Sequence, residues 1–264
     1  MNVTLITGAT SGIGEALAIQ FAEQKHNLLL IARNEQKLQY LCNVLADKNK
    51  IQTEYIVADL SKQGIPEYIY NESKRKNLSV NILINNAGIG SSGEFINNNL
   101  KSELEILQIN NASMVALCHL FLNDMVNNKN GRIINIGSMA SFFPSPYMSV
   151  YAASKMFVLS FTEALTEECR PHGINVMLFC PGLTTSNFMN TDANKNEWGK
   201  VLTARAKTQT PHQVATELIR ALNREKTFHV SGRMNALSAK IASLIPNTTI
   251  AKQFAKSKRK QMGY

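Results

Sequence analysis

Short apolar runs alternate along this chain with longer segments whose apolar residues follow a helical period. Residues 3–7 and 28–32 have the length and aliphatic content of strands that are covered on both faces. Between them, Ile13, Leu17 and Phe21 lie four residues apart and predict the buried stripe of a helix. Because alternating strands and helices are typical of βαβ units, the pattern predicts an α/β fold with a parallel sheet.

The same alternation continues through most of the chain. Further strands are expected at residues 54–58, 81–84, 132–136, 175–179 and 228–230, and further helices over 38–45, about 100–127, about 150–170 and 211–223. No linker rich in glycine, proline or serine divides these elements. We therefore predict one domain over residues 1–235, with about seven strands and helices on both faces, followed by a basic, partly amphipathic extension over 236–264.

The composition narrows the class of protein. Of the 264 residues, 44% are hydrophobic and 18% are charged, which excludes a disordered chain and a collagen-like fibre. The 28 Lys and Arg residues outnumber the 19 Asp and Glu residues and give a formal net charge of +9. A basic surplus of this size suits a nucleic acid, an anionic membrane or a phosphorylated ligand as partner.

Other patterns point to the compartment. No basic stretch leads into an apolar one near residue 1, and the apolar run at 28–32 is far shorter than the roughly 20 residues of a membrane-spanning helix. The four cysteines are widely spaced, and the five histidines show no metal-ligand spacing. We expect a cytoplasmic protein with reduced, buried cysteines and without a metal site.

A glycine-rich turn follows the first predicted strand directly. Residues 7–14 read Thr-Gly-Ala-Thr-Ser-Gly-Ile-Gly and open the first predicted helix. Glycine allows a tight turn and a close approach of a ligand to the backbone, and free N–H groups at a helix start suit a pyrophosphate. The order of strand, glycine turn and helix therefore predicts a dinucleotide-binding site.

The end of the second predicted strand favours one dinucleotide over another. NAD sites usually place an acidic residue there, whereas a basic residue suits the 2′-phosphate of NADP. This chain has Arg33 at that position, and the nearest acid is Glu35. Because a guanidinium binds a phosphate through paired hydrogen bonds, we predict a preference for NADP(H) over NAD(H).

A second group of residues suits acid–base chemistry. Tyr151 and Lys155 lie four residues apart in a helical segment, so their side chains share one face. A nearby cation moves the pKa of a phenol toward the working range of a general acid. Ser138 follows the predicted strand at 132–136, and the carboxyl ends of parallel strands are where such folds bind ligands.

Together these features resemble the short-chain dehydrogenase/reductase family, in the branch with the Thr-Gly-x-x-x-Gly-x-Gly turn. The other marks of the family follow in order at Asp59-Leu60, Asn85-Asn86-Ala87-Gly88, Asn110, Ser138, Tyr151, Lys155 and Pro181-Gly182. The resemblance covers residues 3 to about 230. It implies a Rossmann-type doubly wound parallel sheet.

The resemblance also implies which residues bind the cofactor. The matching positions are Gly8, Thr10, Ser11, Gly12, Ile13, Gly14, Arg33, Asp59, Leu60, Asn86, Ala87, Gly88, Tyr151, Lys155, Pro181, Gly182, Thr184 and Ser186. Asp59 would accept a hydrogen bond from the adenine amino group, and Lys155 would bind the ribose of the nicotinamide. The family commonly has threonine where this chain has Ser186, so the chain departs from the family pattern there.

The catalytic residues implied by the resemblance are Asn110, Ser138, Tyr151 and Lys155. In the reductive direction a hydride leaves C4 of the nicotinamide for a substrate carbonyl, while Tyr151 protonates the oxygen and Ser138 polarises it. Asn110 would hold a water molecule that links Lys155 to solvent. We predict an NADP(H)-dependent oxidoreductase that interconverts a carbonyl and an alcohol. The alternatives are a non-enzymatic NADP(H)-binding regulator and a sugar-nucleotide epimerase.

The substrate pocket is expected to consist of residues 90–95, 139–147 and 187–207. Its apolar candidates are Phe142, Phe143, Pro144, Met148, Phe188 and Met189, with Trp198 on a lid. These residues predict a small-to-medium hydrophobic substrate. The resemblance further implies a homodimer or a homotetramer.

The C-terminal extension carries an apolar stripe over residues 237–245, which ends at Pro246, and five basic residues over 252–260. Two interpretations stay open: a docked helix with a solvated basic face, and an interfacial helix that is drawn to anionic lipid. Nucleic acid is not expected as a partner, because no nucleic-acid-binding motif accompanies the charge.

Overall fold

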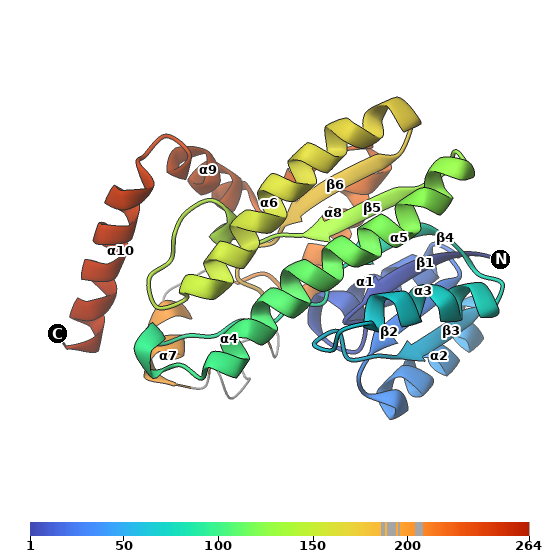
Figure 1. Cartoon of the computed structure of the whole chain (residues 1–264), viewed down its shortest axis with the longest axis horizontal. Coiled ribbons are helices and arrows are strands. Elements are labelled where there is room, and N and C mark those ends of the chain that lie inside the picture. Colours follow the sequence, from blue (N-terminus) through green and yellow to red (C-terminus); the bar gives the residue numbers. More distant parts are fainter. Residues whose placement is uncertain (186–187, 189–193, 195, 204–207, 264) are drawn as a thin grey trace.

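The computed structural model describes residues 1–185, 188, 194, 196–203 and 208–263, and in this part seven parallel strands form one sheet (Figure 1). The strands are β1 (Asn2–Thr7), β2 (Leu28–Ala32), β3 (Thr53–Val57), β4 (Ser79–Asn85), β5 (Arg132–Ile136), β6 (Asn175–Cys180) and β7 (Phe228–Val230). Their order across the sheet is β3-β2-β1-β4-β5-β6-β7.

The direction of winding reverses at the centre of this sheet. The chain builds outward from β1 through β2 to β3, and then returns to place β4 on the other side of β1. Such a reversal leaves a crevice at the carboxyl ends of the two central strands, where doubly wound sheets bind their ligands. The predicted Rossmann-type doubly wound parallel sheet of about seven strands, with helices on both faces, is confirmed.

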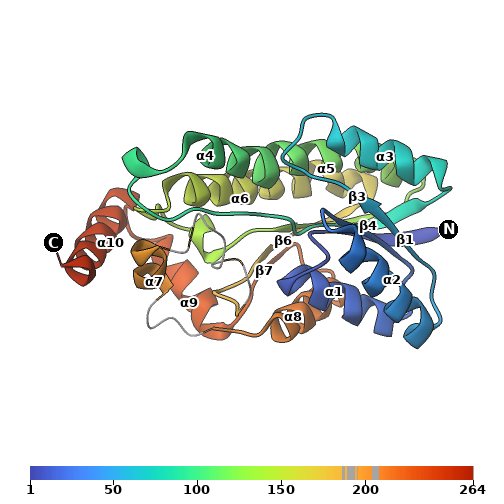
Figure 2. The same ribbon diagram turned by 90° about the horizontal axis from the view of Figure 1, so that it is seen from below.

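Helices cover both faces of the sheet, and Figure 2 shows the three layers edge-on. One face carries α1 (Gly12–Glu23), α2 (Glu35–Asn49) and α8 (Pro211–Asn223), and the other carries α3 (Ile65–Arg75), α4 (Leu100–Leu107), α5 (Ser113–Asn127) and α6 (Ser149–Cys169). Three further helices, α7 (Glu197–Thr203), α9 (Arg233–Ala242) and α10 (Asn247–Met262), lie beyond the carboxyl end of the sheet.

The strands are aliphatic throughout because both of their faces are buried. Consecutive side chains of a strand point to opposite faces, so neighbouring residues enter different core layers. Leu29 packs in the layer that contains Phe121 of α5, whereas Leu30 packs in the layer that contains Phe21 of α1. Because both faces are buried, all five residues of β2 are apolar.

Two elements differ from the prediction, and the first of them bears on the site. The single helix expected over about 100–127 is two helices, α4 and α5, joined by the π-helical turn η2 (Gln108–Ala112). Helix α3 lies where no element was predicted. It buries only a narrow stripe, which includes Ile69, and leaves most of its length polar.

Shorter turns complete the connections. They are the 3₁₀ turns η1 (Phe95–Asn97), η3 (Met139–Ser141) and η4 (Arg170–His172). In the described part of the chain, no helix is both long and apolar enough to cross a bilayer. Over the same residues, no group of His, Cys, Asp and Glu side chains is placed to hold a metal ion.

All four cysteines are free and buried, as predicted. Burial raises the pKa of the Cys118 and Cys180 thiols to about 12. Because the thiolate is the reactive form of cysteine, these two side chains behave as small core residues.

Candidate active site

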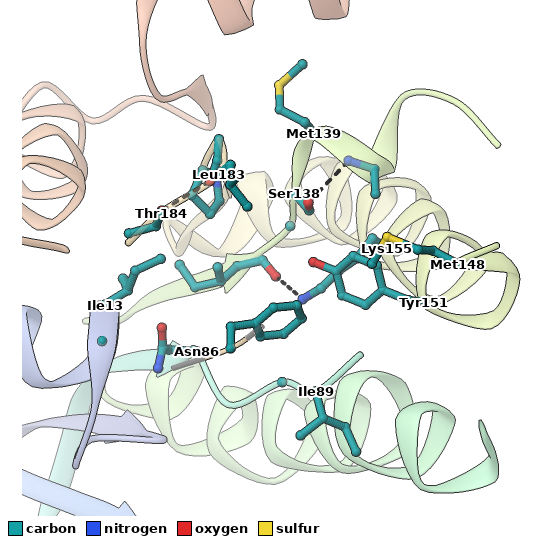
Figure 3. Close-up of a pocket in the computed structure, with 18 of the residues that line it drawn as sticks. Ile13, Asn86, Ile89, Ser138, Met139, Met148, Tyr151, Lys155, Leu183 and Thr184 are labelled. Carbon is teal, nitrogen blue, oxygen red and sulfur yellow. Dashed lines mark hydrogen bonds between the residues drawn. The ribbon is translucent and has the colours of Figure 1, made fainter. Parts of the chain in front are cut away.

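A pocket of about 740 Å³ opens at the carboxyl ends of the central strands (Figure 3). Most of the residues predicted for the site lie around it. The predicted residues that line it are Gly8, Ser11, Gly12, Ile13, Arg33, Asn86, Ala87, Gly88, Ser138, Tyr151, Lys155, Pro181, Gly182 and Thr184. They come from segments up to 176 positions apart, since Gly8 and Thr184 border the same cavity.

The glycine turn after β1 has the backbone shape that its sequence requires. Gly8 and Gly12 have φ angles of +66° and +56°, in the left-handed region that favours glycine. Gly14 allows close packing instead, because a Cβ at this position would collide with the carbonyl oxygen of Gly8. Ser11 and Gly12 line the pocket at the start of α1, where N–H groups without helical partners suit a pyrophosphate.

Thr7 and Asn86 fix this turn to the neighbouring strand β4. The Thr7 hydroxyl accepts hydrogen bonds from the backbone N–H groups of Asn86 and Ala87, at 3.0 and 2.9 Å. The Asn86 side chain in turn donates to the Thr7 carbonyl at 2.9 Å. The two carboxyl-terminal turns that border the pocket are therefore held as one rigid unit.

Arg33 and Asp59 lie near each other where β2 and β3 end. Burial alone raises the pKa of Asp59, but hydrogen bonds from Ser61 and the charges of Arg33 and Lys62 outweigh it and hold the pKa below its ordinary value. Arg33 is exposed and lines the pocket. The Arg33 guanidinium is therefore placed at the rim of the pocket, where it can bind a phosphate group.

Tyr151, Lys155 and Ser138 meet on the opposite side of the pocket from Ile13 and Asn86, as Figure 3 shows. Tyr151 lies in the first turn of α6 and Lys155 one turn later, and their exposed fractions are only 9% and 5%. The Lys155 ammonium lies 6.0 Å from the centre of the Tyr151 ring. Ser138 follows β5 directly, as its position after the predicted strand indicated.

The burial of this group changes its ionisation. Burial raises the pKa of the Tyr151 phenol, and its interaction with the Ser138 hydroxyl acts in the opposite direction. Burial lowers the pKa of the Lys155 ammonium to about 8. The ammonium donates a hydrogen bond of 2.8 Å to the Ile136 carbonyl, which holds it beside the phenol. A cation in this place favours the ionised phenol, so the pair is suited to move a proton.

Asn110 lies behind the pocket on the π-helical turn η2. Its side-chain N–H group donates to the Ile89 carbonyl and to the Ser154 hydroxyl, both at 3.0 Å, and its oxygen accepts from the Ile89 N–H at 3.0 Å. Asn110 therefore ties the loop after β4 to the helix that carries Lys155. The water molecule that the family resemblance implies here stays a prediction.

Two further asparagines, Asn85 and Asn135, link the ends of β4 and β5 inside the core. The Asn85 side chain donates to the Asn135 oxygen at 2.9 Å, and Asn135 donates to the Thr162 hydroxyl of α6 at 3.1 Å. A buried amide that lacks a hydrogen-bond partner destabilises the fold, so these bonds stabilise the junction between the strands and α6. The pair therefore fixes α6, and with it Tyr151, against the sheet.

The remaining predicted residues lie elsewhere. Thr10, Gly14, Asp59, Leu60 and Asn110 lie near the pocket but are not part of its lining, and Ser186 lies outside the described residues. Sequence reasoning missed other lining residues: Ile89, Ile136, Gly137, Leu183, Asn235 and Phe254. Asn235 and Phe254 belong to α9 and α10, far beyond the last motif.

The predicted substrate side is present only in part. Phe143, Met148 and Phe188 line the pocket, whereas Phe142 packs on Phe228 with 6.2 Å between the ring centres. The structure does not place Pro144 in the lining. Met189 and much of 187–207 lie outside the described residues. The side chain of Trp198, expected on a lid, is buried and stacks on Tyr147 at 3.7 Å.

The residues present fit a nicotinamide dinucleotide. One end of the cavity offers the glycine turn and the Arg33 guanidinium, and the other offers the buried Tyr151–Lys155 pair. No Cβ projects from Gly8, where one would come within 3.1 Å of the Ala87 backbone. The turn thus leaves its backbone open to a ligand, as close binding of a pyrophosphate demands.

A family model described as short chain dehydrogenase matches residues 2–198. The chain belongs to the short-chain dehydrogenase family. The resemblance found in the motifs is confirmed by this match, and membership supports an oxidoreductase.

Similar members of the family differ in what they are named for. The chain is 30% identical over 194 residues to the very-long-chain 3-oxoacyl-CoA reductase of Lodderomyces elongisporus, covering 70% of this chain and 55% of the relative. It is 35% identical over 179 residues to the human inactive hydroxysteroid dehydrogenase-like protein 1, covering 67% of this chain and 54% of the relative. The chain thus spans about half the length of these curated relatives.

Solved structures of the family match the whole fold. The short-chain dehydrogenase from Sphingobium yanoikuyae in complex with NADPH has a TM-score of 0.80 and 28% identity, over 92% of this chain and 95% of that chain. The bulky-bulky ketone specific alcohol dehydrogenase from Comamonas testosteroni has a TM-score of 0.76 and 28% identity, over 92% and 93% of the two chains.

Proposed function

We propose that this protein is an NADP(H)-dependent oxidoreductase that interconverts a carbonyl and an alcohol on a small-to-medium hydrophobic substrate. The observation that carries the proposal is the placement of Tyr151, Lys155 and Ser138 on one side of the pocket that the glycine turn also borders. This arrangement offers a substrate carbonyl an acid and a hydrogen-bond donor in the same cavity as the dinucleotide site.

Each of these side chains has a distinct task in the reductive direction. A nicotinamide cofactor bound at the glycine turn would supply a hydride to the carbonyl carbon. Tyr151 donates its phenolic proton to the carbonyl oxygen, and the Ser138 hydroxyl donates a hydrogen bond to the same oxygen. Because this transfer leaves a phenolate, the Lys155 ammonium stabilises the charge that develops on Tyr151. The Ile136 carbonyl and Asn110 keep that helix and its neighbouring loop in place.

The preference for NADP(H) rests on Arg33. Its guanidinium is exposed at the rim of the pocket and can bind a 2′-phosphate through paired hydrogen bonds. The bound NADPH in the Sphingobium yanoikuyae enzyme supports the same cofactor for this chain. A higher affinity for NADPH than for NADH is the direct expectation.

The hydrophobic substrate rests on the lining of the pocket opposite the glycine turn. Phe143, Met148, Leu183 and Phe188 are apolar and border the cavity near the catalytic group. The names of two similar proteins support substrates of this kind, a very-long-chain 3-oxoacyl-CoA and a bulky ketone. An apolar ketone or a 3-oxoacyl thioester fits these surroundings.

We also propose that the protein is a cytoplasmic homo-oligomer, a homodimer or a homotetramer. Apolar side chains on one helical layer support self-association, because Leu104, Leu107 and Phe157 are between 42% and 56% exposed on α4 and α6. Sedimentation equilibrium would give a mass of two or four chains. A mass of one chain at micromolar concentration would contradict this assembly.

As a second partner we propose an anionic membrane, which the protein contacts peripherally. An apolar stripe is exposed on α9 and the turn after it, formed by Met234, Leu237, Ile241, Leu244 and Ile245, with exposed fractions from 40% to 79%. Helix α10 follows directly and adds five cations and no acid. Exposed apolar residues beside cations suit the headgroup region of an anionic bilayer.

This contact is tested by sedimentation with vesicles. The intact chain should pellet with phosphatidylserine vesicles and stay in solution with phosphatidylcholine vesicles. A Leu244→Ser/Ile245→Ser double variant should pellet less, because the exposed apolar side chains are gone. Equal pelleting of both proteins with both lipids would contradict membrane contact.

The function itself is tested by following NADPH absorbance with a panel of apolar ketones, aldehydes and 3-oxoacyl thioesters. We expect the absorbance to fall with at least one of them, and to fall more slowly when NADH replaces NADPH. Tight NADPH binding without turnover of any compound would instead favour a cofactor-binding regulator.

A further inference from the structure

Helix α10 stands beyond the carboxyl end of the sheet, next to α7 (Figures 1 and 2). Its sequence has two stripes with a spacing of four residues. The partly buried stripe contains Ile250, Phe254, Lys258 and Met262, and the exposed stripe contains Lys252, Lys256 and Lys260. A helix places two sets offset by two residues on opposite faces, so α10 turns its apolar face to the protein and its lysines to solvent.

Nearly all of the net charge lies at this end of the chain. Residues 1–225 contain 20 Lys and Arg and 19 Asp and Glu, whereas residues 226–264 contain eight Lys and Arg and no acid. The exposed lysine stripe therefore has no acidic partner in its own segment. The contacts that the structure shows between α10 side chains and the rest of the protein come from Phe254, Lys258 and Arg259 instead.

Three side-chain contacts dock α10, two from its partly buried stripe and one from the exposed Arg259. The Phe254 ring lies 6.4 Å from the Phe143 ring, measured between their centres. The Lys258 ammonium donates to the Val201 carbonyl of α7 at 2.9 Å. The Arg259 guanidinium donates to the Tyr147 hydroxyl at 3.5 Å. Two of the three contacts reach the loop after β5, which lines the pocket through Phe143 and Ser145, and the third reaches α7.

The loop that receives α10 is itself held in an unusual conformation. Tyr147 has a φ angle of +69°, which is uncommon for any residue except glycine and occurs often at functional sites. Its carbonyl accepts a hydrogen bond of 2.9 Å from the Gly93 N–H, and its ring stacks on Trp198. Helix α10 thus packs against a fixed surface.

Phe254 connects the docking of α10 to the pocket, because its side chain lines the cavity. Within the part of the chain that the structure describes, it is the residue of α10 that lines the cavity, together with apolar residues such as Phe143 and Met148. The described lining also contains no aspartate or glutamate, and its two cations, Arg33 and Lys155, are assigned to the cofactor and the reaction. The surroundings of Phe254 therefore suit an apolar group.

We propose that α10 is the outer wall of the substrate pocket, and that Phe254 contacts the part of the substrate farthest from the reacting carbonyl. The enzyme then selects carbonyl compounds whose apolar group is long or bulky enough to reach this ring. The nature of the reacting group rests on the proposed function, whereas the apolar selection rests on the placement of Phe254.

A series of linear methyl ketones of increasing chain length tests this selection with NADPH as reductant. We expect Phe254→Ala to raise KM for the longest ketone about tenfold or more, because lost apolar contacts of this size discriminate by that factor. KM for the shortest ketone and kcat for both should stay near the wild-type values. Phe254→Leu should recover part of the loss, and Gln253→Ala, an exposed neighbour on the same helix, should change nothing.

Equal effects of Phe254→Ala on short and long ketones, or no effect on either, would overturn the proposal. A binding measurement separates this failure from a failure of the proposed function. The chain has one tryptophan, Trp198, and it stacks on the tyrosine that contacts α10, so its fluorescence reports a ligand in this region. If no ketone is reduced but the longest one quenches the fluorescence of the wild-type protein and not that of Phe254→Ala, the proposed reaction is wrong and the role of α10 as pocket wall is supported. If the fluorescence of both proteins is quenched alike, or that of neither is quenched, the proposed contact of Phe254 with the substrate is wrong.

Discussion

The two sides of the pocket are held together by different kinds of contact. On the cofactor side, Thr7 and Asn86 are joined to the backbone of neighbouring strands by hydrogen bonds of 2.9 to 3.0 Å. On the substrate side, aromatic rings pack on one another: the centre of the Phe254 ring lies 6.4 Å from that of Phe143, and Tyr147 stacks on Trp198 at 3.7 Å. The first side is part of the sheet, whereas the second is laid against it.

This difference has a physical consequence. Buried polar groups tolerate little change, because a lost partner leaves an unsatisfied donor or acceptor that costs about 1–3 kcal/mol. Apolar contacts tolerate changes of shape more easily when they keep their volume. The cofactor side is therefore suited to one ligand, and the substrate side can differ among proteins that share the fold.

The largest expected effect separates chemistry from binding. Tyr151→Phe removes the proton donor and should lower the reductive kcat by about 10²–10⁴-fold, while the Kd for NADPH stays close to the wild-type value. Stopped-flow absorbance and fluorescence titration measure the two quantities. The matched control is Tyr147→Phe, which loses only the hydroxyl that contacts α10 and should keep most of kcat. Comparable losses in both variants would erase the distinction between the two sides.

The next effect concerns the phosphate end of the cofactor side. Arg33→Ala should raise the Kd for NADPH about 10- to 100-fold, because a hydrogen bond to a charged group contributes about 1.5–3 kcal/mol. The Kd for NADH should change little. Lys37→Ala, which removes an exposed cation on the following helix, serves as control. An unchanged NADPH affinity in Arg33→Ala would remove the argument for the 2′-phosphate.

Stability offers a direct comparison of the two sides. Asn135→Ala breaks three buried hydrogen bonds, with Asn85, Cys118 and Thr162, and should lower the free energy of unfolding by about 1–3 kcal/mol. Phe254→Ala should cost less, because this ring is only partly buried on an outer helix. Urea unfolding of the cofactor-free protein measures both. A larger loss for Phe254→Ala would show that α10 is part of the core.

The last prediction concerns the pH dependence of reduction, where the effect near pH 8 is small and grows with pH. Burial lowers the pKa of Lys155 to about 8, so its charge is present below that pH and is lost as the pH rises through it. Reductive kcat/KM should therefore fall above pH 8, by about tenfold for each further unit, since the neutral amine no longer stabilises a Tyr151 phenolate. Lys155→Arg, which stays charged, should lack this decline. A flat profile to pH 10 in the wild-type protein would contradict the assignment.

The sequence predicted the site residues whose positions follow from local features, such as a required backbone conformation, the end of a strand or the spacing along a helix. Gly8 and Gly12 have positive φ angles, and Arg33, Ser138 and the Tyr151–Lys155 pair follow strands or share a helix face. Each of these positions can be read from local spacing, because strand ends in a parallel sheet come together by the topology alone.

Other features could not be read in this way. Helix α3 was missed because its buried stripe is narrow: of its eleven residues only Pro66, Ile69 and Ser73 are buried, and just one of these is aliphatic. The π-helical turn at Asn110 was missed because periodicity alone does not reveal one extra residue within a helix. Phe254 carries no local signal at all, since its role depends on a contact with Phe143 across 111 positions.

The central claim is that a hydride passes from the nicotinamide to a carbonyl carbon while Tyr151 supplies the proton. NADPH that carries deuterium at the transferred position of C4, incubated with the enzyme and an apolar ketone, tests it directly by mass spectrometry of the product. We predict one deuterium on the carbinol carbon with the wild-type protein, and a strongly reduced yield of the same labelled alcohol with Tyr151→Phe. An unlabelled alcohol, or an equal yield from both proteins, would contradict the account.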